Sequence, residues 1–133
     1  MRMLALLIGL GAGSAASAQT VTYDCRMGSG RGTGWVMNQY IFQVDKAALK
    51  ATVTDPMINQ FVGQPITTDL DLRSNGNMII KWELPNVPSS LGDRLVRYEA
   101  FINASNGNSW VEGSIAGSPF FAQPRRNGRC AGG

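Results

Sequence analysis

Two cysteines near opposite ends of the sequence constrain the fold more than any other feature. They are Cys25 and Cys130, and the 133-residue chain contains no others. Two cysteines in an oxidising compartment most often pair with each other. We therefore predict one disulfide that ties the first strand to the C-terminal tail; the alternatives are a reactive thiol or an intermolecular bridge. Closing a loop of about 106 residues would stabilise the folded state by roughly 4–5 kcal/mol.

The N-terminal segment has the three parts of a secretory signal peptide. Arg2 gives it a basic start, an apolar run extends from Leu4 to Ala12, and Ala16-Ser17-Ala18 is a small-residue cleavage site. The apolar run is much shorter than the roughly 20 residues that span a bilayer. We therefore expect residues 1–18 to be removed on export to the periplasm or the cell exterior, and the mature protein not to span a membrane.

The remaining residues, 19–133, are enough for one domain with one core. Apolar and polar residues alternate in successive runs, as is typical of strands with one buried face. The expected strands are Thr20–Met27, Trp35–Val44, Leu49–Thr54, Ile66–Arg73, Met78–Leu84, Arg94–Asn103 and Ser109–Ala116. Between them we expect a flexible glycine-rich connection, Gly28–Gly34, a loop from Pro85 to Gly92, and a basic tail from Pro124 to Cys130.

These runs predict an all-β domain. Asn75-Gly76 and Asn106-Gly107 each separate two alternating runs, and this dipeptide favours a tight hairpin turn. About seven or eight strands joined by mostly short connections indicate a small antiparallel up-and-down barrel, since closure removes exposed strand edges. A β-sandwich is the alternative.

One connection is unusually apolar. Asp55-Pro56 is a helix-start signal, because aspartate can cap free N–H groups while proline takes the first helical position. A helical turn or structured loop should follow, either as a lid on the core or as an exposed contact surface. Two tryptophans near strand ends also fall off the inward pattern. The candidate partner contacts are therefore Met57, Ile58, Phe61, Val62, Trp35 and Trp110.

Four aromatic residues lie on the expected inward faces: Tyr40, Phe42, Trp82 and Tyr98. We interpret them as core. The alternative is that they line a cavity, because small barrels can hold one small ligand.

Several kinds of chemistry are excluded by composition. The chain has no histidine, which removes Ser-His-Asp and Cys-His catalysis and the usual zinc sites. Asp69 and Asp71 share a strand face, but the alternation places that face toward solvent, where charges are expected. We therefore predict a protein that is not an enzyme and has no cofactor and no metal.

Arginines are the remaining candidate binding groups. The disulfide would bring the basic tail beside the start of the chain and so gather Arg26, Arg31, Arg125, Arg126 and Arg129. Guanidinium groups suit phosphates and carboxylates, so an anionic envelope component is a candidate partner. A solvated tail is the alternative. The net charge of +3 is mild and gives no reason to expect nucleic acid.

Short motifs across the mature chain resemble a group of small exported bacterial proteins with no assigned function. The motifs are Tyr23-Asp24-Cys25, Gly34-Trp35-Val36, Asp55-Pro56 with Ile58 and Phe61, and Gly128-Arg129-Cys130. This resemblance implies a periplasmic β-domain. The Tyr-x-Cys opening is also similar to that of periplasmic lysozyme inhibitors of the MliC type, which are small disulfide-bonded β-barrels. Their serine-glycine motif is not evident here, because Ser29-Gly30 and Ser90-Leu91-Gly92 lack its context.

Together these observations predict a non-enzymatic periplasmic binding or accessory domain that acts on an unknown partner through surface contacts. Two alternatives are carriage of a small apolar ligand inside the barrel and inhibition of a cell-wall hydrolase.

Overall fold

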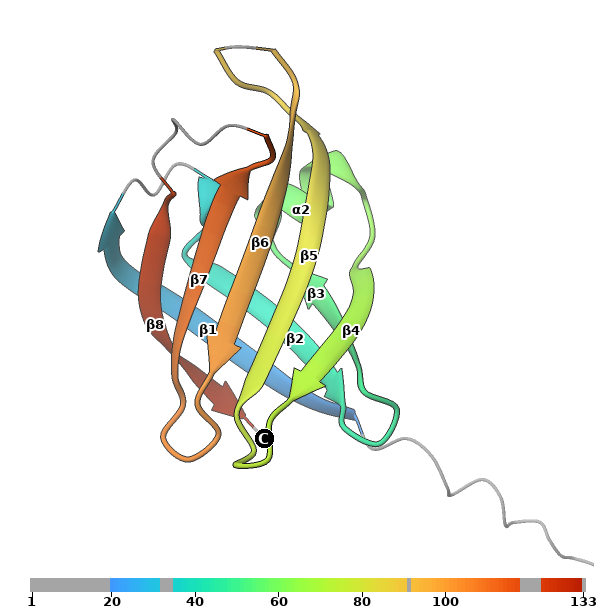
Figure 1. Ribbon diagram of the computed structural model, residues 1–133, viewed down its shortest axis with the longest axis vertical. Helices are drawn as coiled ribbons and strands as arrows, with labels where there is room; N and C mark the ends of the chain where they lie inside the picture. The colour runs from blue at the N-terminus through green and yellow to red at the C-terminus, as the bar shows by residue number, and fades with distance from the viewer. Residues whose placement is uncertain (1–19, 32–34, 91, 118–122, 133) are drawn as a thin grey trace, which may run out of the picture.

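The computed structural model describes residues 20–31, 35–90, 92–117 and 123–132. Within these residues, eight antiparallel strands pair in sequence order, and the last pairs with the first to close a barrel (Figure 1). The strands are β1 (Thr20–Arg31), β2 (Gln39–Asp45), β3 (Lys50–Thr54), β4 (Ile66–Leu72), β5 (Met78–Val87), β6 (Arg94–Ile102), β7 (Asn108–Ile115) and β8 (Arg125–Gly132). The predicted barrel is confirmed. The expected signal peptide, residues 1–18, lies outside the described residues.

The seam between β1 and β8 closes the barrel. Cys25 and Cys130 lie directly opposite each other in its register and form the predicted disulfide. Two glycines make the seam possible: a Cβ on Gly30 would overlap the Arg125 carbonyl oxygen, and a Cβ on Gly128 would overlap that of Arg26. Close approach of two backbones is a role that only glycine fills without displacement.

This seam corrects two expectations. The glycine-rich stretch is not a flexible connection over residues 28–31, because it continues β1 through a bulge between Met27 and Gly30. Residues 32–34 of that stretch lie outside the described residues. The C-terminal basic segment is not a free tail, because it forms β8 and pairs on both sides. In both places backbone pairing overrides the weak strand preference of glycine and arginine.

The bounds of two other strands differ from those expected from the sequence, for local reasons. β5 continues to Val87 through a region assigned to a loop, with Asn86 at a positive φ of 58° inside an irregularity of the β5–β6 pairing. Leu49 belongs to the turn before β3, also at positive φ, and is exposed rather than inward. The two Asn-Gly hairpins are confirmed, with Gly76 and Gly107 at φ of 89° and 77°.

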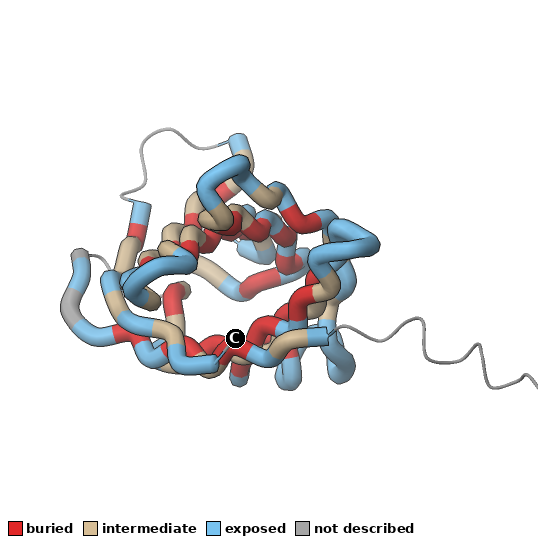
Figure 2. Tube along the Cα trace, turned by 90° about the horizontal axis from the view of Figure 1, so that it is seen from below, coloured by how far each residue is buried: buried red, intermediate tan, exposed pale blue. Residues whose placement is uncertain are grey.

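The inward faces form one continuous core (Figure 2). Its centre holds the four predicted aromatic residues, all buried. Trp82 stacks on Tyr98 with ring centroids 5.2 Å apart, and both Tyr40 and Phe42 lie 5.8 Å from Trp82. Gly113 leaves room for the Tyr98 ring, since a Cβ there would lie 3.2 Å from it. Aromatic rings in mutual contact therefore fill the middle of the barrel.

One short helix, α2 (Pro56–Phe61), covers one end of the barrel. It follows the predicted start signal: Asp55 is the N-cap and accepts a hydrogen bond from the Ile58 amide at 2.7 Å, with proline at the first helical position. Ile58 is fully buried and closes the core at this end. Within the described residues, no helix is both long and apolar enough to cross a membrane.

Candidate binding site

A shallow groove opens to solvent where α2 meets the end of β5. Its volume is about 420 Å³. The residues that line it are Trp35, Met37, Pro56, Met57, Gln60, Phe61, Val87 and Pro88. None of them is charged, and Gln60 supplies the one polar side chain among these eight. We refer to this site as the α2 groove.

The floor of the α2 groove is fixed by two buried tyrosines. The Tyr98 hydroxyl donates to the Trp35 carbonyl at 2.7 Å and lies 3.6 Å from the Met57 sulfur. The Tyr40 hydroxyl accepts from the Met37 amide at 3.0 Å. Burial is the main cause that raises the pKa of both tyrosines above the ordinary value of 10.0, so both hydroxyls stay protonated. These bonds hold Trp35 and Met37 over the barrel end.

The helix cap lies beneath the same site. Asp55 is 5% exposed. Burial raises the pKa of its carboxyl above the ordinary value of 3.8, while hydrogen bonds from the Ile58 amide and the Tyr40 hydroxyl act in the opposite direction. Asp55 thus connects α2 to the aromatic core. We assign its carboxyl group a structural role, because that group already caps the helix.

Exposed apolar side chains border the groove. Phe61 and Val62 keep 36% and 38% of their surface exposed. In the described part of the chain, the other large apolar residue with comparable exposure is Leu49, in the β2–β3 turn at the other end of the barrel. Two of these three residues therefore lie together at the α2 end.

The predicted partner contacts divide into three groups. Trp35, Met57 and Phe61 meet in the α2 groove, with Val62 just beyond the helix. Ile58 is not a contact residue, because the capped helix turns it into the core. Met57 is mostly buried and offers the groove only a small part of its surface.

Trp110 lies away from the groove, on the outer face of β7. Its ring stacks on Phe101 with centroids 5.9 Å apart, and the Arg125 guanidinium lies 4.1 Å from its centroid. Two neighbours from this chain therefore pack against the indole, which leaves less of it for a partner.

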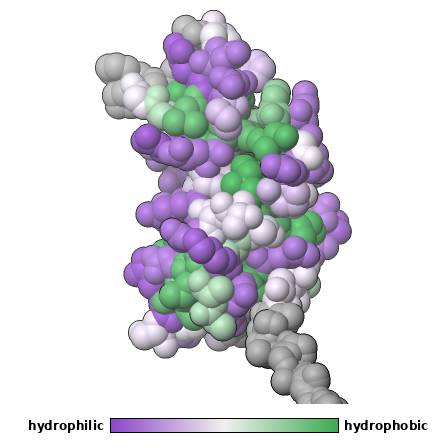
Figure 3. Space-filling model, turned by 90° about the vertical axis from the view of Figure 1, so that its right-hand side faces the viewer, coloured by the Kyte–Doolittle hydropathy of each residue, from purple (hydrophilic) through white to green (hydrophobic). Residues whose placement is uncertain are grey.

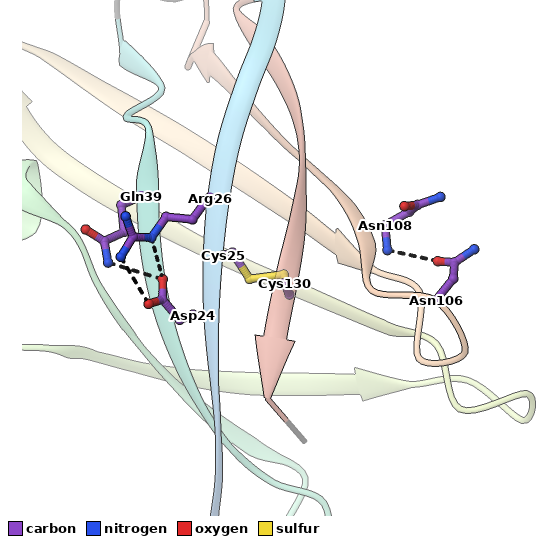
Figure 4. The surroundings of a disulfide bond; sticks show 7 residues. All are labelled: Asp24, Cys25, Arg26, Gln39, Asn106, Asn108 and Cys130. Atoms are coloured by element: carbon purple, nitrogen blue, oxygen red, sulfur yellow. Dashed lines mark hydrogen bonds and ion pairs between the residues drawn. A yellow bond between two sulfur atoms is a disulfide. The ribbon is translucent and has the colours of Figure 1, made fainter.

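The five predicted anion-binding arginines are spread along the β1–β8 seam, and the four whose side chains are described engage partners within the chain. Arg26 binds Asp24, which also accepts from Gln39 (Figure 4). Arg129 donates to the Asn108 side chain at 2.7 Å and to the Asn106 carbonyl at 2.8 Å.

Arg126 differs from these two because it lies on the inward side of β8, opposite buried Val111. Its guanidinium donates to the carbonyls of Val36 at 2.9 Å and Gly28 at 3.1 Å. Arg125 lies over Trp110, 4.0 Å from Glu112. Arg31 ends β1, and its side chain is outside the described residues. Arg125, Arg126 and Arg129 therefore link β8 to neighbouring segments, whereas exposed Arg26 pairs only within β1, and a shared anion site stays a prediction.

Five of the eight residues that line the α2 groove are not among the contacts predicted from the sequence: Met37, Pro56, Gln60, Val87 and Pro88. Met37 was assigned to the interior of a strand, whereas β2 begins two residues later. The sequence predicts a loop at Val87 and Pro88, because Pro85 and Pro88 lie on either side of Val87. No local pattern in the sequence could bring these positions together with Trp35 and Phe61.

Comparison with known proteins adds no family or fold relative: no family model, curated protein or solved structure matches this chain. Among the residues that the structure describes, no group of three or more His, Cys, Asp or Glu could hold a metal ion. The eight described residues that line the α2 groove offer apolar contact and shape, and none of these eight is a nucleophile or a general base.

Proposed function

We propose that this protein is a non-enzymatic binding domain, exported to the periplasm or secreted, that engages apolar side chains of a partner protein in the α2 groove. The observation that carries the proposal is the neutral groove of about 420 Å³ on a rigid floor, bordered by exposed Phe61 and Val62. The disulfide is compatible with an oxidising compartment and so supports export.

The open shape of the groove favours a polypeptide over a free small molecule. Pockets for small ligands usually enclose most of the ligand surface, whereas this groove is open to solvent on one side. A side chain on a larger partner gains further contact from the surface around it. Met37 and Met57 add flexible, polarisable walls, which suit apolar side chains of differing shape.

The packed barrel interior argues against carriage of a ligand. Such a ligand would occupy the space now filled by Trp82, Tyr98 and the rings beside them. Removing that packing would expose large apolar surfaces and would cost several kcal/mol of stability. Surface contact therefore fits the structure better than carriage does.

A photo-crosslinking experiment in cells that make the protein tests this proposal. Benzoylphenylalanine replaces Phe61 in one variant and Leu49, which is 47% exposed at the other end of the barrel, in the control. We expect a discrete polypeptide adduct from position 61 and none from position 49. The adduct should disappear when Met37→Asp is added, because this change places a charge on the groove wall. Equal adducts from both positions, or no adduct from position 61, would contradict the proposal.

A further inference from the structure

One wall of the α2 groove is held by side chains from three strands. This wall is the segment Trp35–Met37, whose first and last residues line the groove. Tyr98 of β6 bonds the carbonyl of its first residue, and Tyr40 of β2 bonds the amide of its last. Between them, Arg126 of β8 donates its Nε–H to the Val36 carbonyl at 2.9 Å. The Arg126 guanidinium is therefore bonded to the residue that lies between the two groove residues of this wall.

The charge of Arg126 is not neutralised within the chain. Its two hydrogen bonds go to neutral carbonyls, those of Val36 and Gly28. All nine Asp and Glu residues of the sequence lie in the described part of the chain, and none of them forms an ion pair with Arg126. By contrast, four other described arginines each lie within 4.0 Å of a carboxylate: Arg26, Arg73, Arg97 and Arg125.

Part of the Arg126 guanidinium is available to a ligand. An arginine side chain has five N–H groups, and the bonds to Val36 and Gly28 use two of them, so the others have no partner among the described residues. The bond to Val36 is partly buried and the bond to Gly28 is exposed, so the guanidinium reaches from the barrel interior to the surface. Such a group favours a carboxylate, because its fork matches two oxygens and partial burial reduces solvent screening.

Neighbouring carboxylates do not compete for this position. Glu112 lies 4.0 Å from Arg125, so these two charges largely cancel. Asp55 lies beneath the groove on the α2 side, where three hydrogen-bond donors already satisfy its carboxyl group. A negative charge on Asp55 disfavours a second anion beside α2 and directs it toward the opposite wall.

The surface beyond the groove is largely polar. The side of the barrel that carries β4 shows hydrophilic side chains around smaller apolar patches (Figure 3). Apolar contact on that side is therefore limited. A partner that fills the groove gains further affinity from polar contacts at its rim.

We propose that the polypeptide that fills the α2 groove carries a carboxylate beside its apolar side chain, and that Arg126 binds this carboxylate. This inference rests on the proposed binding of a polypeptide in the groove and names the chemistry of that polypeptide. The carboxylate belongs to a C-terminus or to an aspartate or glutamate side chain. Contact with Trp35 and Met37 supplies apolar area, and the ion pair fixes the orientation of the bound segment.

NMR titration of the oxidised, isotope-labelled protein with two pairs of blocked peptides tests this inference. In the first pair, acetyl-leucyl-phenylalanine has a free C-terminal carboxylate and its amide does not. In the second pair, acetyl-leucyl-phenylalanyl-glutamate amide has a side-chain carboxylate and its glutamine counterpart does not. Binding is followed at the Met37 amide, in the groove wall, and at the Arg126 Nε–H.

We expect an acidic peptide to bind at least about tenfold more tightly than its neutral counterpart at neutral pH and to shift both signals. A preference in the first pair assigns the carboxylate to a C-terminus, and a preference in the second assigns it to a side chain. Equal affinities within both pairs, with shifts at Met37, would overturn the inference and leave polypeptide binding in the groove intact. Shifts at Arg126 alone, or no binding by any peptide, would also overturn it; crosslinking from position 61 decides the proposed function separately.

Two variants locate the carboxylate. Arg126→Gln removes the charge, so the ratio of affinities for the acidic and neutral peptides should fall to about one. Arg26→Gln, at an exposed position that pairs with Asp24, should keep the wild-type ratio. If Arg126→Gln does not fold, added salt tests the wild type: it should weaken binding of the acidic peptide several-fold and leave the neutral peptide unchanged. An unchanged ratio in Arg126→Gln, or a salt-independent affinity of the acidic peptide, would overturn the inference.

Discussion

Reduction of the Cys25–Cys130 disulfide should lower the stability of this protein by a large and calculable amount. The bond joins residues separated by 105 positions, and the chain-entropy model gives about 4.8 kcal/mol for a loop of that size. Reduction removes no side-chain atoms other than the bond itself, so no cavity complicates the comparison. A loss of this size is a large part of the roughly 5–15 kcal/mol that stabilises a typical domain.

Urea unfolding of oxidised and reduced protein, followed by tryptophan fluorescence, measures this difference. The slope of the free energy against urea should be steeper for the reduced protein, since its unfolded state is less compact and exposes more surface. If the reduced protein is already unfolded in buffer, both forms are compared in sucrose, which favours compact states. A loss below about 1 kcal/mol with equal slopes would refute the argument that the disulfide acts by restricting the unfolded chain.

Three further predictions follow from individual contacts. Ile58→Ala should lower the unfolding free energy by about 2–5 kcal/mol, because Ile58 of α2 is fully buried. Val62→Ala, at an exposed position, should lower it far less. Equal losses would contradict the role of Ile58 in closing the core. Asp55→Asn keeps a side chain that can cap the helix but removes the titrating carboxyl. Because burial raises the pKa of Asp55, the wild type should lose stability relative to this variant as the pH rises from about 3.8 through the raised pKa. A difference in unfolding free energy that does not change with pH, measured by urea titration, would refute this. Arg126→Met should lower the unfolding free energy by about 1–3 kcal/mol, because two backbone carbonyls lose a charged donor. Arg26→Met should leave the unfolding free energy nearly unchanged, because the Arg26 side chain is 70% exposed. The reverse order in thermal or urea unfolding would show that the roles assigned to these two arginines are wrong.

The fold could be predicted in large part because most of its signals are local. Alternation in Met78–Leu84 and Arg94–Ile102 identifies the inward faces, and every inward residue predicted there is buried. The disulfide then indicates which strands meet. The Asp55-Pro56 signal likewise predicts a helix start from two neighbouring residues, and the cap forms as expected.

The errors lie where tertiary pairing opposes local preference. β1 continues through Gly28 and Gly30 because it pairs there with β8. The two backbones approach too closely for a side chain at Gly30 or Gly128, so these positions need glycine. The strand character of Arg125–Gly132 likewise depends on partners far away in sequence. Neither effect leaves a periodic pattern that the sequence alone could show.

The candidate site was harder to predict than the fold. Trp35 was predicted as a contact because it falls off the inward pattern, and Met57 and Phe61 because they lie in an unusually apolar connection; all three meet beside α2. Ile58 lies in the same apolar connection but is buried, because the helix turns it toward the core and leaves Phe61 exposed.

The central claim, that the protein binds a polypeptide through the α2 groove, is tested most directly by native mass spectrometry. The protein is purified without denaturation from the cell envelope or medium of cells that make it, in parallel with a Phe61→Asp variant. We predict a complex of the wild-type chain with a second polypeptide, and the chain alone for the variant. A bare wild-type chain, a bound small apolar molecule, or the same complex in both samples would contradict the claim.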